Sequence, residues 1–395
     1  MKKISMFMSA LALLAFAACG EKDGLGDEEF IEDGFYVVGE ATGSDNIQSD
    51  YMMAAGFNEV TKSKRDGMYE KYVALEKGKT FSLAIYEAGE TTLYGAELGD
   101  MNLEGLDNNP PMVIKRGSLQ EGENAPKMTV EESGLYHIVL DLNKAKDLNT
   151  ALIIVAPAKW GIRGKMNGWG YTEMTAPAFN AKKMTWTIKN VTNEIPDGYK
   201  FTYAHGWKVN MDDMGNVKAE IGLGNNSDSD NLPLMENDLV QYGKNIQVKR
   251  GIWDIELTWT LKGGNLGKNF TAKMTKVGEV PFNDNVPEYK LGLIGAIAGT
   301  NWDTDLLFTY VSESNGTYKF EIAEQAIEAD AQFKVRSAGT WDKHNLGYSN
   351  VKITGDADNF EDKGGNIGCK SAATYKITLT FNPSEWEWVL NFEKK

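Results

Sequence analysis

Gly134–Leu142, with the sequence GLYHIVLDL, carries a large apolar side chain at every second position. The same alternation returns in 251–259 (GIWDIELTW) and in 373–381 (ATYKITLTF). A period of two residues is typical of a β-strand with one buried face. The aromatic residues that open this face are 117 and 122 residues apart. The chain therefore contains three similar units, each of which reaches such a strand near its end.

The beginnings of the three units are also alike. A short apolar strand ending in glycine is expected at 35–39 (FYVVG), 160–164 (WGIRG) and 291–295 (LGLIG). Between these points the sequence is punctuated by glycine and asparagine and shows no convincing amphipathic helix, although 323–331 would suit either a helical turn or a loop. We predict an all-β chain of three tandem immunoglobulin-like or carbohydrate-binding-module β-sandwiches.

The N-terminus has the pattern of a secretory signal. Two lysines follow Met1, residues 4–18 are almost entirely apolar, and small residues precede Cys19. This ending resembles the bacterial lipobox, with Phe16 where leucine is usual, and the resemblance implies that Cys19 carries the lipid. An ordinary signal peptide is the alternative. The acidic residues after Cys19 resemble the surface-export signal of Bacteroidota lipoproteins, which implies an outer-membrane lipoprotein that faces the cell exterior.

These patterns together predict the domain organisation. We expect a lipoprotein signal peptide at 1–18, an acidic tether at 19–33, an N-terminal immunoglobulin-like sandwich at 34–156, a second sandwich at 158–276, a polar linker at 277–288 and a third sandwich at 289–395. The second and third sandwiches are expected to be carbohydrate-binding-like, for the reasons that follow.

Composition excludes several classes of function. The chain of 395 residues has a formal net charge of −15, which is unsuited to binding the nucleic-acid backbone. It has only two cysteines, so with Cys19 lipidated no intrachain disulfide is possible, and Cys369 is expected to be a buried strand residue. Two pairs of alternating aspartates, Asp228/Asp230 and Asp356/Asp358, lack the rest of a calcium loop. We expect no metal and no cofactor.

The tryptophans are unevenly distributed. All ten lie after residue 158, and several of them belong to alternating strands and are expected in the core. Four instead stand in or beside turn-rich segments: Trp169 and Trp207 in the second unit, and Trp302 and Trp341 in the third. The spacing is 38 residues in one unit and 39 in the other. Two loop tryptophans repeated at one spacing suggest an aromatic platform, although packing at a domain rim would also account for each of them.

Polar side chains accompany these tryptophans. Lys334 and Arg336 alternate with Val335 and so point away from the core, and Asn345 follows Trp341. Lys200 and Thr202 stand in the matching places of the second unit, whose site is therefore poorer in donors. A pyranose ring packs its C–H face on an aromatic ring and needs hydrogen-bond partners around its edge. The pattern predicts sugar binding, with a solvated strand face as the alternative for the charged residues.

At this point the chain resembles a known family, the SusE and SusF starch-binding lipoproteins of the Bacteroidota starch-utilisation system. The likeness rests on the lipobox, the acidic tether, and repeats built on a Gly-x-x-x-Gly-Trp pattern, as at 164–169, followed by a Phe-Lys-x-Arg…Trp pattern, as at 333–341. It implies a first sandwich without a sugar site, followed by starch-binding modules that capture glycan for a neighbouring transporter. The site residues carried over are Trp169, Trp207, Lys200, Trp302, Trp341, Lys334, Arg336 and Asn345.

Two other kinds of function compete with non-catalytic glycan capture. Glycoside hydrolysis needs two suitably placed carboxylates, and 56 acidic residues make chance pairs inevitable, but no catalytic motif accompanies them. The chain is therefore expected not to be an enzyme. The other rival is a surface adhesin or structural lipoprotein that binds a protein partner or a non-starch glycan. A protein-binding surface predicts buried tryptophans or one contiguous patch, whereas glycan binding predicts separate, partly exposed clusters on successive sandwiches.

Overall fold

The protein is all-β, as the sequence predicts. We describe a computed structural model over residues 31–58, 63–103, 112–142, 148, 151–203, 208–210, 218–235, 239–241, 243–263, 269–297 and 301–395. Across these ranges the regular elements are strands and short 3-10 turns, and none of them is an α-helix. The predicted signal peptide and most of the predicted tether, including Cys19, lie outside these residues.

The first pair of sheets is built from residues up to Pro157. One sheet has the order β1-β4-β5-β8, with β9 paired to β4. Its strands are β1 (Gly34–Val38), β4 (Thr80–Glu87), β5 (Glu90–Gly95), β8 (Gln120–Glu121) and β9 (Met128–Thr129). The other has the order β2-β3-β10-β11-β7-β6. Its strands are β2 (Ala54–Asn58), β3 (Ser63–Leu75), β6 (Gly99–Leu103), β7 (Met112–Ser118), β10 (Gly134–Asp141) and β11 (Leu152–Pro157).

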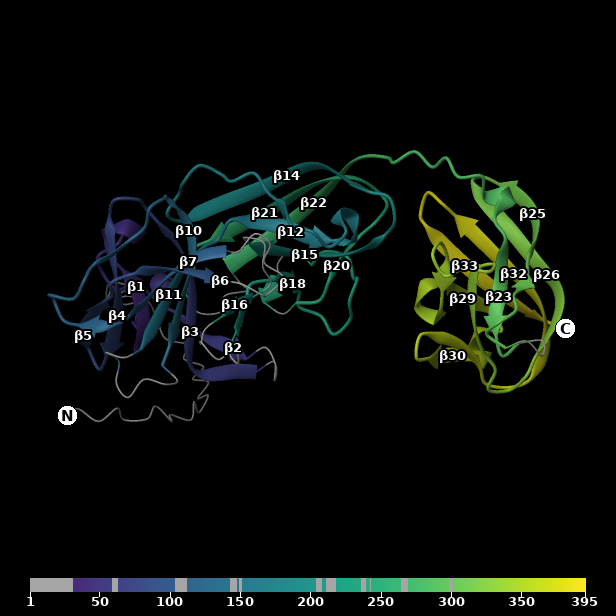
Figure 1. Ribbon diagram of the computed structural model, residues 1–395, viewed down its shortest axis with the longest axis horizontal. Coiled ribbons are helices and arrows are strands. Elements are labelled where there is room, and N and C mark those ends of the chain that lie inside the picture. Colours follow the sequence, from purple (N-terminus) through teal and green to yellow (C-terminus); the bar gives the residue numbers. More distant parts are fainter. Residues whose placement is uncertain are drawn as a thin grey trace, which may run out of the picture. The chain divides into compact units, whose positions relative to one another are not determined.

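The second pair of sheets follows directly. The larger sheet has the order β13-β12-β15-β18-β19, with β20 paired to β15. Its strands are β12 (Trp160–Gly164), β13 (Thr172–Glu173), β15 (Asp197–Tyr203), β18 (Leu223–Asn225), β19 (Leu239–Gln241) and β20 (Ile246–Val248). The smaller sheet contains β14 (Lys183–Asn193), β21 (Gly251–Thr260) and β22 (Phe270–Gly278), which run side by side in Figure 1. A separate ribbon joins β16 (Lys208–Asn210) and β17 (Lys218–Glu220).

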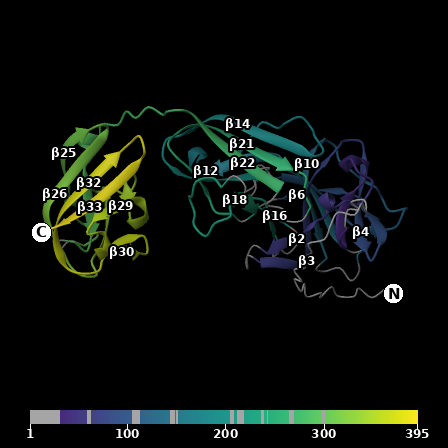
Figure 2. The same cartoon turned by 180° about the vertical axis from the view of Figure 1, so that it is seen from behind.

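The third pair of sheets occupies the C-terminal part of the chain. Its first sheet has the order β24-β23-β27-β31-β30, with β28 paired to β27. These strands are β23 (Leu291–Gly295), β24 (Leu306–Leu307), β27 (Gln332–Ser337), β28 (Asn345–Leu346), β30 (Phe360–Lys363) and β31 (Asn366–Cys369). The second sheet, seen from behind in Figure 2, has the order β25-β26-β32-β33-β29. These strands are β25 (Thr309–Ser314), β26 (Thr317–Ile327), β29 (Lys352–Gly355), β32 (Ala373–Asn382) and β33 (Glu387–Lys394).

Short 3-10 turns connect some of the strands. They are η1 (Glu40–Thr42), η2 (Ser49–Tyr51), η4 (Lys165–Asn167), η6 (Val286–Glu288), η7 (Tyr348–Asn350) and η8 (Ala357–Asn359). The segment 323–327, for which the sequence suggested a helical turn or a loop, is instead the end of β26, with a register shift between Ile322 and Gln325. A bulge adds a residue to one strand without ending the sheet, and this disturbs the alternation that the sequence would otherwise show.

The chain forms two compact units. The first takes in most of the described residues up to Val277, and the second takes in Gly278–Lys395 with the short segments Thr192–Pro196 and Lys249–Ile252. One continuous hydrophobic core runs through both pairs of sheets in the first unit, and the second unit has a core of its own. The predicted three-domain boundaries remain a prediction, since the first two pairs of sheets share a core.

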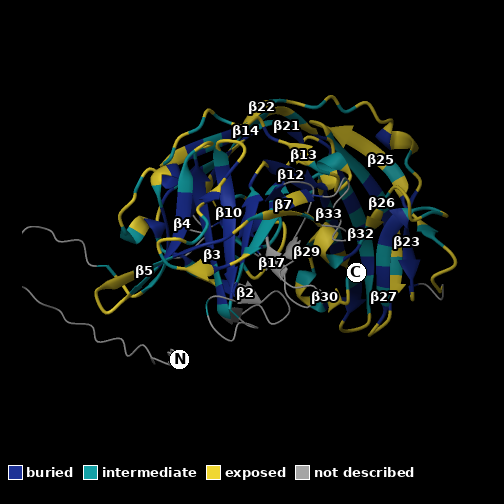
Figure 3. Ribbon diagram, turned by 60° about the vertical axis from the view of Figure 1, so that its left-hand side comes forward, coloured by how far each residue is buried: buried dark blue, intermediate teal, exposed yellow. Residues whose placement is uncertain are grey.

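Strands β10 and β32, each near the end of its sequence repeat, show why the first two pairs of sheets are joined. In β32 the predicted face is buried, from Tyr375 to Phe381, and the other face is half-buried, as expected. The corresponding β10 differs from the expectation, because almost every residue is buried and the strand is dark blue in Figure 3. Its second face is covered by aromatic residues of the second pair of sheets. The His137 ring lies there, with its Nδ1 2.8 Å from the hydroxyl of Tyr203.

Candidate functional site

The outward face of β27 presents the polar residues predicted for the third sandwich. Phe333 and Val335 are fully buried in the core, so Lys334 and Arg336 point to the opposite face of the sheet. Strand β28 pairs Asn345 with Arg336, which brings the predicted asparagine to the same face. The Nζ of Lys334 donates a hydrogen bond to Oδ1 of Asn345 at 3.4 Å. The three predicted polar residues are therefore neighbours.

The two predicted tryptophans of this sandwich also meet. Trp302 precedes β24 and Trp341 follows β27, yet their ring centroids are 6.4 Å apart, with the ring planes inclined by 34°. Trp302 is 38% exposed and Trp341 is 42% exposed. We call these two side chains the tryptophan platform. Both rings are therefore partly buried against the protein and partly accessible to solvent.

Arg336 supports the platform rather than standing free beside it. Its guanidinium lies over the ring of Trp341, 4.5 Å from the centroid. The same guanidinium donates to both carboxylate oxygens of Asp305, from Nε at 2.7 Å and from Nη2 at 2.9 Å. The planar fork of arginine suits this two-point contact, which sets the orientation of the group. Two of the five N–H groups of the guanidinium are thereby committed to Asp305.

Asp305 links the arginine to the loop that carries Trp341. Its Oδ2 accepts a third hydrogen bond, from the backbone amide of Gly339 at 3.0 Å. Burial by itself would raise the pKa of the Asp305 carboxyl, but the hydrogen bonds from Arg336 and Gly339 and the charge of Arg336 lower its pKa below the ordinary value. The hydrogen bond to Asp305 correspondingly raises the pKa of Arg336. Both groups are therefore charged at neutral pH.

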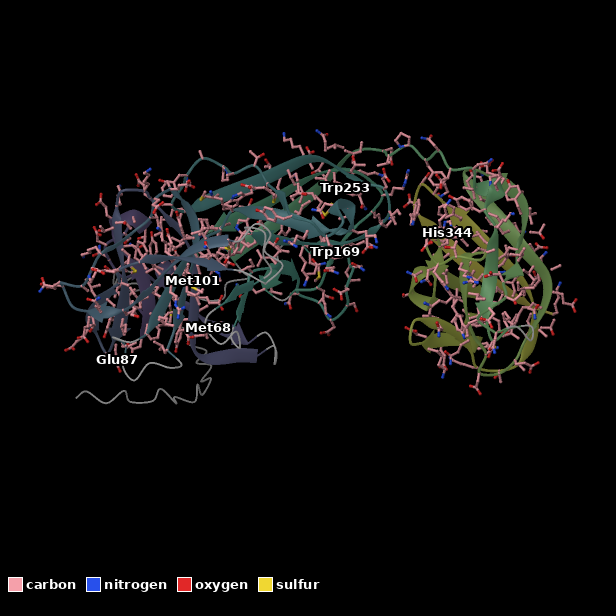
Figure 4. All side chains as sticks on the ribbon, viewed as in Figure 1. Met68, Glu87, Met101, Trp169, Trp253 and His344 are labelled. Carbon is pink, nitrogen blue, oxygen red and sulfur yellow. The ribbon has the colours of Figure 1, made fainter. Side chains whose placement is uncertain are left out.

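His344 holds the far end of the same loop. Its Nδ1 lies 2.8 Å from the hydroxyl of Ser337, and its ring packs between Tyr289 and Trp388, with centroid distances of 4.9 Å and 5.3 Å. Figure 4 labels this histidine within the C-terminal unit. Burial, with the charge of Lys343, lowers the pKa of His344 below its ordinary value. The loop that carries Trp341 is thus fastened at both ends.

Strand register relates the second sandwich to the third. In the third, β23 pairs Gly292 with Arg336 and Ile294 with Lys334. In the second, β12 pairs Gly161 with Thr202 and Arg163 with Lys200. Counting from the glycine of each opening strand, Lys200 matches Lys334 and Thr202 matches Arg336, as the sequence predicted. Thr202 is fully buried, so it does not reach a ligand at that surface.

Arg163 takes a place that the sequence analysis did not assign. It lies opposite Lys200, on the same face, where the third sandwich has Ile294. Its Nη1 donates to the carbonyl oxygen of Trp169 at 3.2 Å. The second sandwich therefore also places an arginine beside a loop tryptophan, but the arginine comes from the neighbouring strand.

Trp169 is held in an unusual backbone conformation. Its φ is +62°, directly after Gly168 with the same φ. A left-handed conformation is costly for a bulky residue and persists only where the surroundings impose it. Here the imposing residue is Asn167, which bonds the amide of Gly164, the carbonyl of Ile162 and the hydroxyl of Thr172 at 2.9–3.0 Å. The result is a tryptophan 38% exposed at the surface.

Figure 4 labels Trp169, and also Trp253, which belongs to β21 in the other sheet of the second sandwich. The predicted partner of Trp169, Trp207, lies outside the described residues. The structure therefore brings together the predicted residues of the third sandwich, and in the second it places Trp169 and Lys200 on neighbouring segments.

Asp305 and Arg163 are the residues of these surfaces that sequence reasoning missed. Arg163 stands in an opening strand of alternating pattern, so its outward direction was readable from the sequence. Asp305 lies 31 residues before Arg336 in a turn-rich segment, and nothing in the local pattern pairs the two. Only the position of the segment relative to β27 shows the contact.

The remaining candidates from the sequence have structural partners. Cys369 is buried at the end of β31. Asp230 accepts from the amide of Asn245 at 2.8 Å, and Asp356 accepts from the hydroxyl of Tyr375 at 2.7 Å. Within the described ranges no three histidine, cysteine or acidic residues gather as a metal site would require. The same ranges contain no helix with the length and hydropathy needed to cross a membrane.

Comparison with known proteins gives little guidance. No protein-family model matches the chain, and no curated protein matches it. Among solved structures, the crystal structure of SusF from Bacteroides thetaiotaomicron aligns with 91% of this chain and 77% of its own, at 13% sequence identity and a TM-score of 0.23. A likeness at this level carries no argument about fold or function, so both rest on the geometry described above.

Proposed function

We propose that this protein is a non-catalytic glycan-binding protein whose main site is the tryptophan platform of the third sandwich. The observation that carries the proposal is the meeting of Trp302 and Trp341, both partly exposed, beside Lys334, Arg336 and Asn345. Aromatic faces pack on the C–H faces of sugar rings, and the polar side chains supply donors and an acceptor for hydroxyl groups.

The character of the surface favours a sugar over a protein partner. The exposed tryptophans belong to different compact units, Trp169 to the first and Trp302 and Trp341 to the second. Each site also contains a basic residue, which can donate hydrogen bonds to sugar hydroxyl groups. Separate aromatic sites on successive sandwiches are the arrangement expected for a protein that binds a long polymer.

The inclination of the two rings supports an α-glucan. Two coplanar rings would suit a flat ribbon of sugars, whereas planes inclined by 34° suit a chain that turns between successive units. The resemblance of the sequence pattern to starch-binding lipoproteins points the same way. Starch or a related α-glucan is therefore the favoured ligand.

The second sandwich supplies a weaker site in this proposal. Trp169 and Lys200 are its predicted members, and Arg163 adds a charged group next to them. Two weak sites on one chain gain from effective concentration when both engage a single polymer, by about 10²–10⁴-fold over either alone. Trp207 remains the predicted second ring of this site.

Lipidation of Cys19 would place the sites at the cell surface. The signal pattern and the acidic tether support an anchor in the outer membrane, with the sandwiches facing outward. Bound glycan would then be passed to a neighbouring transporter complex for uptake. The alternative is a surface adhesin that binds a protein partner, and a failure to bind any of the polysaccharides tested below would favour it.

Affinity electrophoresis of the purified protein tests the proposal. Gels containing amylopectin, pullulan, dextran, xylan or fructan are compared for the wild type, Trp302→Ala, Trp341→Ala and the control Val311→Ala. We expect amylopectin to retard the wild type and the control. Either tryptophan substitution should weaken binding by about 1–2 kcal/mol, or about five- to thirtyfold, because buried aromatic anchors dominate such interfaces.

Three results would contradict the proposal in different ways. Retardation by a different polymer would keep glycan binding and change the ligand. If amylopectin retards both tryptophan variants as strongly as the wild type, the platform is not the binding site. Release of reducing sugar ends from amylopectin by the pure protein would show catalysis, which the proposal denies.

A further inference from the structure

An open groove lies beside β24, the edge strand of the sheet that carries the proposed site. It has a volume of about 460 Å³ and is lined by the segment Pro287–Lys290 with Leu307, Phe308 and Tyr310. Leu307 is 53% exposed, the highest exposure of any large apolar side chain in the described residues. The groove therefore offers an apolar leucine and two tyrosines, with the charged residues Glu288 and Lys290 at its rim.

Strand pairing connects this groove to the tryptophan platform. Leu307 pairs with Gly292, Gly292 pairs with Arg336, and Arg336 pairs with Asn345. Directly paired residues of antiparallel strands point to the same face, so these four residues form one row across four strands. The row leads from the polar residues of the proposed site to the groove.

Gly292 allows a close approach between β23 and the segment that carries Asp305 and Leu307. A Cβ atom at this position would lie 2.9 Å from the Cβ of Asp305 and 3.4 Å from a methyl carbon of Leu307. Leu307 and the Asp305–Arg336 ion pair therefore flank a position that has no side chain of its own. The absence of a side chain at Gly292 thus lets Asp305 and Leu307 pack over β23, between the polar residues of the proposed site and the groove.

The far wall of the groove is tied to the loop that carries Trp341. The amide of Ala338 donates to the carbonyl of Lys290 at 2.8 Å. The ring of Tyr289 packs on His344, in the same loop, at 4.9 Å between centroids. The groove and the platform are thus parts of one supported surface within the C-terminal unit.

We propose that the groove is a further subsite of the glycan site, which takes additional units of an α-glucan chain beyond those that rest on the tryptophan platform. This proposal rests on the proposed function. The apolar side chain of Leu307 and the tyrosine rings would pack on sugar C–H faces, and Glu288 and Lys290 would meet hydroxyl groups. Affinity should then rise with chain length, because a short oligosaccharide occupies the platform alone.

Isothermal titration calorimetry with maltotriose and maltoheptaose tests this subsite. The purified protein is compared with Leu307→Ala and with the control Val311→Ala, which alters a side chain of similar exposure, 48%, outside the groove. We expect the wild type to bind maltoheptaose more tightly than maltotriose. Leu307→Ala should weaken maltoheptaose binding by about three- to tenfold and leave maltotriose binding unchanged. The control should alter neither.

The possible failures can be told apart when Trp341→Ala is measured in parallel. If Leu307→Ala leaves both affinities unchanged, or lowers both equally, while Trp341→Ala abolishes binding, the groove is not a subsite and the platform stands. If the wild type binds neither oligosaccharide, the subsite and the α-glucan proposal both fail. Leu307 and Val311 are exposed, so thermal melting of the variants should match the wild type and exclude misfolding as the cause.

Discussion

At the scale of single residues, Asp305 decides how the proposed site is arranged. Its carboxylate holds the guanidinium of Arg336 with two hydrogen bonds and the amide of Gly339 with a third. Arg336 in turn lies against the ring of Trp341. The orientation of an exposed tryptophan is therefore set by a buried ion pair. Removing one partner of a buried ion pair leaves the other charge buried without compensation, which destabilises the folded protein.

Substitution of Asp305 by asparagine tests this arrangement. Asparagine keeps the size of the side chain, but its amide nitrogen cannot accept the bonds now made to one of the carboxylate oxygens. We expect glycan binding to weaken by about fivefold or more, since the loss of one charge-assisted hydrogen bond costs about 1–3 kcal/mol. Calorimetric titration measures the change, and unaltered affinity would show that Trp341 is positioned without the ion pair.

The pH dependence of stability gives a second readout of the same substitution. The folded state lowers the pKa of Asp305, so its stabilising effect is present above the unfolded pKa of about 4 and is lost as the pH falls through the folded value. The difference in unfolding free energy between wild type and Asp305→Asn should therefore be constant near neutral pH and shrink in acid. Urea denaturation at pH 7 and at pH 3 provides the comparison.

At the scale of elements, β3 and β10 join the first two pairs of sheets through buried polar groups. His137 bonds Tyr203 from Nδ1 and Glu70 from Nε2, both at 2.8 Å, and its ring stacks on Tyr72 at 4.4 Å. Lys71 donates to the carbonyls of Asp50 and Lys262. The contacts of His137 with Tyr203 and of Lys71 with Lys262 reach from the first pair of sheets to residues of the second, and the other contacts hold these two side chains in place.

Lys71 makes this junction sensitive to pH. Burial lowers the pKa of its ammonium group to about 7, although the charge of Asp50 opposes the shift. Between about pH 7 and pH 10 the unfolded chain therefore holds a proton that the folded chain has released, and stability rises with pH in that window. The slope for one proton is about 1.4 kcal/mol per pH unit.

Lys71→Met isolates this contribution. We expect the unfolding free energy of the wild type to increase by about 2 kcal/mol relative to that of the variant between pH 7 and pH 9, because only the wild type releases a proton on folding. Chemical denaturation of both proteins at several pH values supplies the measurement. Parallel pH curves for the two proteins would mean that Lys71 keeps its ordinary pKa in the folded state.

At the scale of the whole molecule, two cores serve three pairs of sheets. Trp160 is fully buried in the first unit and packs edge-on against Tyr203 and Phe270, at 5.4 Å and 5.1 Å, while its ring lies 5.8 Å from Tyr72. Tyr72 belongs to the first pair of sheets and the other three residues belong to the second. Shared burial of this kind makes the two pairs of sheets depend on each other for stability.

Differential scanning calorimetry should therefore resolve two unfolding transitions. We expect Trp160→Ala to lower the midpoint of one transition and Phe381→Ala, in the core of the C-terminal unit, to lower the other, each through a loss of about 3–5 kcal/mol of stability. Three transitions, with Trp160→Ala affecting only the second sandwich, would support the three independent domains that the sequence predicted.

Much of the architecture follows from local sequence patterns. Alternation at 373–381 predicts a strand with one buried face, and the glycine-ended openings predict β1, β12 and β23 within a residue of their observed bounds. The repeated spacing of loop tryptophans singles out Trp302 and Trp341, whose rings lie next to each other in the structure. These features are local because the period of a strand and the length of a repeat are properties of neighbouring residues.

The sequence by itself thus determined the all-β class, the threefold repetition and the candidate residues of the third sandwich. Only the tertiary structure decided that β10 is buried on both faces, that Asp305 orients Arg336 and that Leu307 joins the row leading from the platform. The physical reason is that these contacts depend on which strands pair, and in what register, across 15 or more residues. A periodic pattern shows which face of a strand is apolar, but it does not show what covers that face.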